Sequence, residues 1–246
     1  MRRDCSSIPP LHPLLRAVKS TRLDSASEQS DCFPEMIRTA LIAFALAISA
    51  APALAHPHVW VTMRSDLVYA PDGKLTGIRQ HWAFDDMFSA FATQGLESKE
   101  KDKFTREELQ PLAKENVESL KDFDYFTFLT VDGGKVPLGD PLSDYWLDWN
   151  DSVLTLNFTL PLKQPVETKH LNIDVYDPTI FVDFAFEKQE PAKLVGAPAG
   201  CKLAVVPPRE MTFAEGKALS DIPPDQPNLT MQWGAQFANK IRVDCP

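Results

Sequence analysis

Hydrophobic and polar residues alternate along the stretch from Val59 to Tyr69. An alternation with a period of two and one apolar face is typical of a half-buried β-strand. The sequence therefore predicts a strand over residues 59–69 whose apolar face lies in the core. That face comprises Val59, Val61, Met63, Leu67 and Tyr69.

A hairpin is predicted to follow this strand. Residues 70–73, Ala-Pro-Asp-Gly, are a turn signal, and a second alternating strand comes directly after them. A four-residue loop sets the register of the two strands. It pairs Tyr69 with Lys74, Val61 with Trp82, Val59 with Phe84, Thr62 with His81 and His58 with Asp85. We therefore expect His58, His81 and Asp85 on one face outside the core, with His56 extending along it.

A helical insert is predicted over about residues 104–121. Thr105 and Glu108 have the spacing of a capping box, and apolar residues recur behind them with helical spacing. Pro111 conflicts with a helix that starts at Thr105, because it lies beyond the first turn. The helix begins either at Thr105 or at Pro111.

The chain after this insert is rich in short β-strand patterns. Residues 124–138 predict a strand, an Asp-Gly-Gly turn and the start of another strand. We expect further strands over residues 152–162, 170–176 and 180–186, and one strand-like or helical piece at residues 231–243. Prolines are dense from Glu190 onward and the pattern fades there. The expected fold class is mainly β or α+β, a β-sandwich-like domain with a helical insert.

Residues 36–55 have the pattern of a secretory signal peptide. They begin with Met-Ile-Arg, continue as an apolar run, and end in Ala-Leu-Ala. The run contains Pro52 and is short for a membrane span of about 20 apolar residues. Cleavage after Ala55 predicts a single periplasmic domain over residues 56–246 that does not itself span the membrane. Residues 1–35 have a composition that does not bury a core, which indicates a spurious or disordered leader upstream of Met36.

Two cysteines remain in the predicted mature chain, Cys201 and Cys245. Exported proteins fold in oxidising compartments, so one disulfide between them is the simplest interpretation. It would staple the C-terminal segment, residues 190–246, onto the domain. A pair of thiolate metal ligands is the alternative.

Charge and motifs make several classes of function less favourable. The whole chain carries a net charge of −9, and residues 1–55 contribute six Lys/Arg against five Asp/Glu, which leaves −10 on the mature part. A chain this acidic is a poor candidate for nucleic-acid binding. The sequence has no G-x-S-x-G, H-E-x-x-H, P-loop or dinucleotide-binding motif, so we expect no enzymatic activity.

The histidines point to metal chemistry. Three of the four in the mature chain, His56, His58 and His81, fall in the first hairpin. Neutral imidazoles together with the Asp85 carboxylate suit zinc, nickel or copper. As the first mature residue, His56 would also offer its α-amine, which is partly unprotonated at neutral pH. A structural His58–Asp85 hydrogen bond without metal is the alternative.

Asp177 is a further candidate ligand, because it ends an alternating strand just before Pro178. At this position a carboxylate either binds a metal or accepts hydrogen bonds from its own turn. The sequence leaves both interpretations open.

Four segments together resemble a known bacterial family. HPHVWV, HWAFDDMFSAF, YFTFLTVDG and YDPTIFVDF are similar to the domain of unknown function 1007 family. The resemblance implies a periplasmic component of an uncharacterised ABC-type transport system, associated with nickel/cobalt or zinc permeases. It maps the motif positions of that family onto His56, His58, His81, Asp85 and Asp177.

These observations predict a periplasmic metal-binding accessory protein of a transition-metal transport system. Its expected partners are an inner-membrane metal permease or ABC transporter subunits. Two alternatives remain: a β-sandwich interaction module without metal, and a copper oxidoreductase in which His56 forms a histidine brace.

Overall fold

The computed structural model describes residues 59–220 and 234–246, which form a mainly β, α+β domain with two sheets. This architecture confirms the expected fold class. The predicted leader, the predicted signal peptide, His56 and His58 lie outside the described residues.

The first sheet has six strands and contains the predicted hairpin at its centre. Its order is β5-β6-β2-β1-β8, and β9 pairs with β1 beyond the end of β8. Its members are β1 (Val59–Tyr69), β2 (Leu75–Phe84), β5 (Trp146–Asn150), β6 (Val153–Val166), β8 (Val182–Phe186) and β9 (Ala192–Val195).

The second sheet has five antiparallel strands in the order β10-β11-β7-β3-β4. The β3–β4 turn contains Asp132 and Gly133, both with positive φ, as a two-residue hairpin turn requires. The strands are β3 (Thr127–Val131), β4 (Gly134–Val136), β7 (His170–Val175), β10 (Lys202–Val206) and β11 (Asn239–Asp244).

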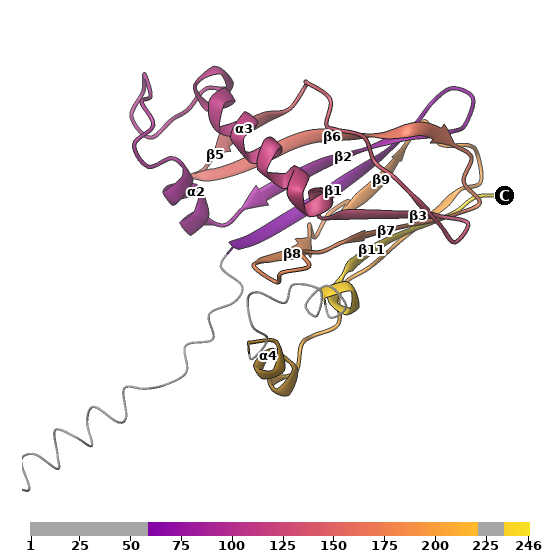
Figure 1. Cartoon of the computed structure of the whole chain (residues 1–246). Coiled ribbons are helices and arrows are strands. Elements are labelled where there is room, and N and C mark those ends of the chain that lie inside the picture. Colours follow the sequence, from indigo (N-terminus) through magenta and orange to yellow (C-terminus); the bar gives the residue numbers. More distant parts are fainter. Residues whose placement is uncertain (1–58, 221–233) are drawn as a thin grey trace, which may run out of the picture. The chain divides into compact units, whose positions relative to one another are not determined.

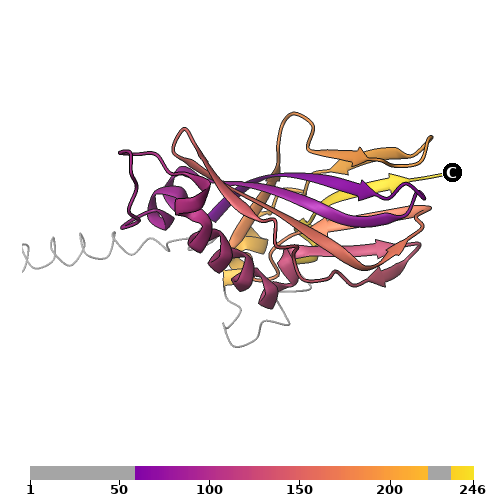
Figure 2. The ribbon, with the colours of Figure 1, turned by 90° about the horizontal axis from the view of Figure 1, so that it is seen from above.

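Helices cover the part of the first sheet that the second sheet leaves open. Figures 1 and 2 show α2 and α3 over the end where β1 begins and β2 ends, and the second sheet over the opposite end. The long strand β6 runs beneath both covers. The helical elements are α2 (Asp86–Ala92), α3 (Arg106–Leu120), η1 (Lys121–Phe126), α4 (Phe213–Ser220) and η2 (Ala235–Phe237).

One apolar face of the first sheet forms the core. All five apolar residues that the alternation assigned to the inner face of β1 are buried, and so are the alternate leucines and Phe158 of β6. α3 contributes Leu109, Ala113 and Val117 to the same cluster. The period-two patterns therefore predicted the correct faces.

The register predicted for the β1–β2 hairpin is wrong. Tyr69 pairs with Leu75 rather than Lys74, and a bulge shifts the following pairs so that Val61 faces Phe84 and His81 faces Arg64. At the bulge the Thr76 hydroxyl donates to the Val68 carbonyl. An extra residue on one strand shifts the pairing there. Because the total shift is two residues, every side chain keeps its predicted face.

The helical insert begins at the earlier of the two predicted positions. Thr105 caps α3, and its hydroxyl and the Glu108 carboxylate form a reciprocal capping box. Pro111 lies inside the helix and lacks an N–H for the carbonyl four residues before it. The cap and the buried apolar face outweigh that lost bond.

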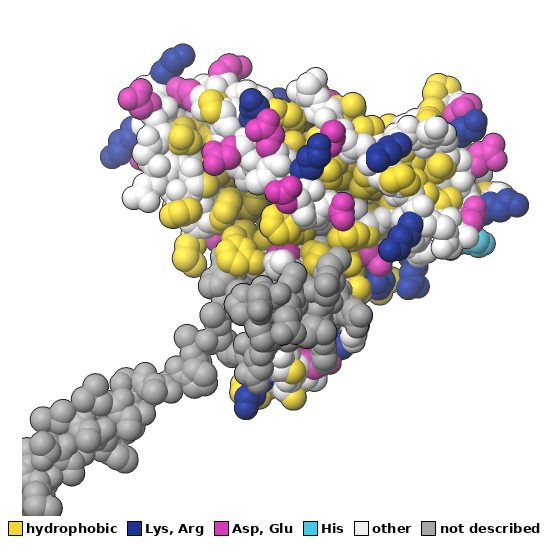
Figure 3. Space-filling model, in the orientation of Figure 1, with side chains coloured by type: hydrophobic (Ala, Val, Ile, Leu, Met, Phe, Trp, Pro, Cys, Tyr) yellow, Lys and Arg dark blue, Asp and Glu magenta, His cyan; other side chains and the backbone are white. Residues whose placement is uncertain are grey.

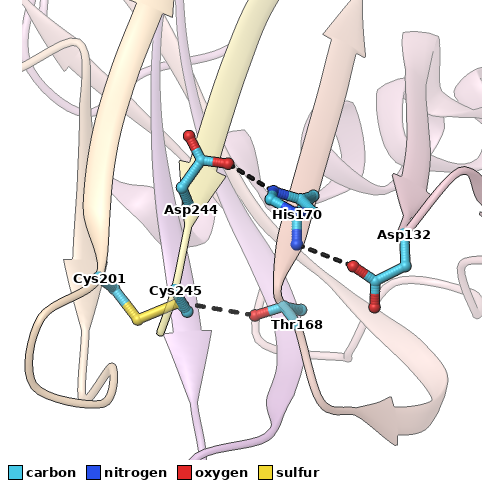
Figure 4. Close-up of a disulfide and its surroundings, with 6 residues drawn as sticks. All are labelled: Asp132, Thr168, His170, Cys201, Asp244 and Cys245. Carbon is cyan, nitrogen blue, oxygen red and sulfur yellow. Dashed lines mark hydrogen bonds and ion pairs between the residues drawn. A yellow bond between two sulfur atoms is a disulfide. The ribbon is translucent and has the colours of Figure 1, made fainter.

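The Cys201–Cys245 disulfide is confirmed. It links the residue before β10 to the residue after β11, across a sequence separation of 44 residues. Figure 4 shows it at the edge of the second sheet, near His170, whose ring pairs with Asp244 at 2.7 Å. The bond links the start of β10 covalently to the end of β11, the C-terminal strand.

We predict that replacing both Cys201 and Cys245 with Ser lowers the free energy of unfolding by about 2–4 kcal/mol, because the open chain has more conformations in the unfolded state. Urea unfolding measures the change. Reduction of the unmodified protein should give the same loss. A double variant as stable as the oxidised protein would contradict a stabilising role for this bond.

Candidate functional site

Asp85 fixes the start of β1 to the start of α2. Its Oδ1 accepts from the Phe88 N–H at 2.9 Å as the N-cap of α2, and its Oδ2 accepts from the Trp60 N–H at 2.9 Å. The Asp85 N–H donates in turn to the Trp60 carbonyl. A carboxylate has about four acceptor sites, so Asp85 retains capacity for a cation.

Asp177 holds the turn that leads into β8. Its carboxylate accepts from four donors: the Thr179 N–H and hydroxyl, the Phe181 N–H and the Val182 N–H, at 2.7–3.0 Å. Only 4% of the residue is exposed. Four donors fill about four acceptor sites, so this carboxylate organises the turn and has no free position for a metal ion.

The start of β1 lies between these two carboxylates. Asp85 binds Trp60 on one side, and Val59 donates to the carbonyl of Phe181, in the Asp177 turn, on the other. The structure thus brings Asp85 and the Asp177 turn to one end of β1.

Asp183 is a residue at this end that the sequence analysis did not select. It is the neighbour of Trp60 across β1 and β8. Partial desolvation by its neighbours raises the pKa of its carboxyl group above the usual value, although the residue as a whole is exposed. Only the parallel β1–β8 pairing reveals this position, because 123 residues separate the two partners in the sequence.

His81 lies elsewhere, on the outer face of the first sheet. Its Nδ1 is 2.6 Å from Asn157 Oδ1, and its Nε2 is 3.4 Å from Asp66 Oδ2. Asn157 Nδ2 donates to the Asp148 carboxylate, so Oδ1 is the acceptor and His81 Nδ1 is the donor. Both ring nitrogens are therefore engaged within the protein.

His81 is also distant from the other predicted ligands. It pairs with Arg64, five residues along β1 from Val59, which corresponds to ~17 Å of strand. Asp85 follows it by four residues, or ~13 Å. One metal ion therefore does not contact His81 together with ligands at the start of β1.

Asp66 is a buried carboxylate on the outer face, and the sequence did not reveal its burial. Asp66 belongs to the polar side of β1 but is only 2% exposed. Its Oδ2 lies 3.4 Å from His81 Nε2, 3.6 Å from Lys193 Nζ and 3.8 Å from Arg79 Nη1, while its Oδ1 has no partner. The charges of Lys193 and Arg79 offset the buried negative charge and oppose the approach of a metal cation to His81.

A polar hollow of about 270 Å³ lies beside His81 on this face. Residues of β1, β2 and β6 line it together with Glu187, which faces Arg64 at 4.0 Å. Its lining includes one histidine and one carboxylate. This is too few for a closed metal site, which takes three or four protein ligands.

Residues 59–220 and 234–246 contain no group of three or more His, Cys, Asp or Glu residues arranged to hold a metal ion. Within the same residues, none of the helices has the length and apolar character required to cross a bilayer.

The protein is therefore a mainly β domain with a helical cover. The carboxylate of Asp85 and the turn held by Asp177 both lie at the end where β1 begins. The family model for the protein of unknown function DUF1007 matches residues 41–245, and the chain belongs to that family.

Two bacterial proteins are similar to this chain in sequence. An uncharacterized protein of Haemophilus influenzae is 23% identical over 195 residues, covering 78% of this chain and 92% of the relative. An uncharacterized 15.5 kDa protein in the trpE 3' region of Spirochaeta aurantia is 32% identical over 93 residues, covering 37% and 66% of the two chains.

We predict that Asp177→Ala lowers the free energy of unfolding by about 2–4 kcal/mol, because it leaves several partly buried donors without an acceptor. Urea unfolding measures the loss. Asp144→Ala removes an exposed carboxylate and should change stability by less than about 0.5 kcal/mol. Equal effects of the two substitutions would refute the structural role of Asp177.

We predict that Asp183→Asn raises the melting temperature at pH 7 and that this gain fades as the pH falls towards about 4. The raised pKa of Asp183 means that folding disfavours its ionised form. That cost is present above the folded-state pKa and disappears below the ordinary value of 3.8, where both states are protonated. Thermal unfolding at several pH values, with Asp144→Asn as control, measures it. A gain that did not depend on pH would contradict this explanation.

Proposed function

We propose that the protein is an exported metal-binding accessory of a transition-metal transport system. His56 and His58 would be the principal ligands, and zinc, nickel or copper the metal. The accessory would bind or buffer the ion in the periplasm and deliver it to a permease or ABC transporter in the inner membrane. The proposal assigns it no catalysis.

The observation that carries the proposal is the half-occupied carboxylate of Asp85 beside the start of β1. This oxygen pair accepts one hydrogen bond from Trp60 and one from Phe88, and keeps further acceptor capacity. His58 precedes Trp60 by two residues, so the two α-carbons lie within about 7 Å of each other in any conformation. Asp85 is therefore within reach of an ion held by the histidine segment.

The chemistry of the segment favours a borderline transition metal. Imidazole nitrogens with one carboxylate oxygen suit zinc, nickel and copper rather than magnesium or calcium. If cleavage makes His56 the first residue, its α-amine and ring nitrogen chelate the same ion. Pro57 has no amide N–H, which disfavours binding through a deprotonated amide at the second position.

The proposed ligand set is smaller than the set the sequence suggested. The Asp177 carboxylate is filled by hydrogen bonds from its own turn. Both nitrogens of His81 are engaged, and Arg79 and Lys193 surround its acidic partner. His56, His58 and Asp85 remain, and solvent or a partner protein would complete the coordination.

We predict that the exported, cleaved protein binds one zinc, nickel or copper ion and that His58→Ala weakens this binding at least tenfold, because it removes one of two imidazole ligands. Intact mass establishes whether His56 is the first residue, and calorimetric titration gives stoichiometry and affinity. Asp85→Asn tests the carboxylate in the same titration and should weaken binding less.

His170→Ala is the matched control, because His170 is an exposed histidine at the start of β7, the central strand of the second sheet. His81→Ala is the second control, and both should leave the affinity unchanged. The proposed site would be refuted if the unmodified protein bound the metal no more tightly than His58→Ala does. It would also be refuted if His170→Ala lost as much affinity as His58→Ala. Copper binding with oxidase activity would instead favour the histidine-brace alternative.

One observation favours a second candidate function, a protein-interaction module. The short helix α2 exposes 69% of Met87 and 73% of Phe91. Large apolar side chains exposed close together are typical of contact surfaces. Retention of a transporter subunit by the metal-free protein, and its loss in a Met87→Ser/Phe91→Ser variant, would support this function.

A further inference from the structure

A small cavity lies between the first sheet and its helical cover, at the end where β1 begins. It has a volume of about 140 Å³. Its walls are almost entirely apolar and come from β1, β2, α2, α3, η1, β6 and β8; they include Phe88, Leu120, Phe126 and Phe184. A cavity on the order of 150 Å³ with such walls holds one benzene-sized molecule.

Trp82 lines this cavity and carries an unpartnered hydrogen-bond donor. The residue is 1% exposed, and its indole Nε1 is buried with no hydrogen-bond partner in the described part of the chain. The ring is held by edge contacts with Phe158 and Phe184, each with a centroid distance of 4.9 Å. A buried N–H without an acceptor is costly and rare in folded proteins. Because this N–H has almost no accessible surface, an acceptor in the cavity would reach it only after a small shift of the surrounding side chains, and it would then gain the hydrogen bond that the fold leaves unmade.

We propose that this cavity is a binding site for a compact, mainly apolar small molecule that carries one hydrogen-bond acceptor. A monocyclic ketone, ether or alcohol has this chemistry. The apolar part would fill the space between Phe88, Leu120 and Phe184, and the acceptor would pair with Trp82 Nε1–H. None of the described residues that line the cavity is a proposed metal ligand, and this inference does not rest on the metal proposal.

The size and lining of the cavity decide this class of ligand. A volume of about 140 Å³ is too small for a long acyl chain or a nucleotide. Among residues 59–220 and 234–246, no charged side chain lines the cavity, so an ionic ligand would lose its hydration without compensation. Within the same residues Asn116 of α3 is the one further polar side chain of the lining, and its Nδ2 already donates to the Leu112 carbonyl. Pockets of this composition use few polar groups to orient a ligand.

The surface beside the cavity is also apolar. Figure 3 shows hydrophobic side chains gathered below α2 and α3, near the start of β1. Phe123 in η1 is 42% exposed, and Phe91 of α2 is 73% exposed. An apolar ligand would meet this surface before it reached the cavity.

Nuclear magnetic resonance of the full processed protein tests the proposal directly. The probes are cyclohexanone and methylcyclohexane, which have similar shapes but differ in the acceptor. The sequence has five tryptophans, and the signal missing from the Trp82→Phe spectrum identifies the Trp82 indole N–H. We expect cyclohexanone to shift this proton downfield with saturation, and methylcyclohexane to bind without such a shift.

Two substitutions test separately the hydrogen bond from the indole donor and the space that the ligand occupies. Trp82→Phe should weaken cyclohexanone binding about three- to tenfold relative to methylcyclohexane, as expected for one lost hydrogen bond. Leu120→Phe fills the cavity and should abolish binding of both probes. Leu142→Phe, at an exposed position outside the cavity lining, should change neither.

Absence of saturable binding by either probe in the unmodified protein would overturn the proposal, even if Trp82→Phe failed to fold. Saturable binding of both probes without a downfield shift would overturn the role of the indole donor. Repeating the titration with His58→Ala should give the same affinities, so failure of the metal proposal and failure of this one are distinguishable.

Discussion

The need to bury one continuous apolar face shared by β1, β2 and β6 is the constraint on which the rest of the domain depends. These strands have 11, 10 and 14 residues, and their inner side chains form an uninterrupted core. The second sheet covers one end of this face, and α3 covers the other. The helices do not fill all the space above their end of the face, and the cavity beside Trp82 lies there.

The start of β1 depends on polar contacts rather than on apolar packing. Asp85 ties Trp60 to the first turn of α2, and the Asp177 turn ties Val59 through Phe181. Both carboxylates satisfy main-chain N–H groups that have no partner within a strand or helix, which is a structural requirement. The two carboxylates differ in their remaining acceptor capacity: hydrogen bonds occupy all the acceptor sites of Asp177, whereas Asp85 retains some. That difference directs the metal proposal to the histidine segment and Asp85.

The outer face of the first sheet shows why polar residues in a strand are not all equivalent. Trp146, Asn157, His81 and Arg64 are neighbours across four strands. Asp66 lies one position further along and is buried beneath its cationic partners. Its neighbours convert an apparently solvent-facing carboxylate into the centre of a charge network. His81 belongs to that network, which explains its burial without any metal.

Local patterns in the sequence determined much of this fold. Alternation identified β1, β6 and their inner faces, the Thr105–Glu108 pair identified the start of α3, and the two remaining cysteines identified the disulfide. Each of these signals lies within a few residues or follows from composition, so no knowledge of distant partners was needed. Only the tertiary structure decided the rest. The bulge at Thr76, the pairing of β5, β9 and β10, the burial of Asp66 and the saturation of Asp177 each depend on which distant segments meet. A period of two fixes the face of a residue, whereas its partner, its burial and its free acceptor sites are set by contacts between strands far apart in the chain.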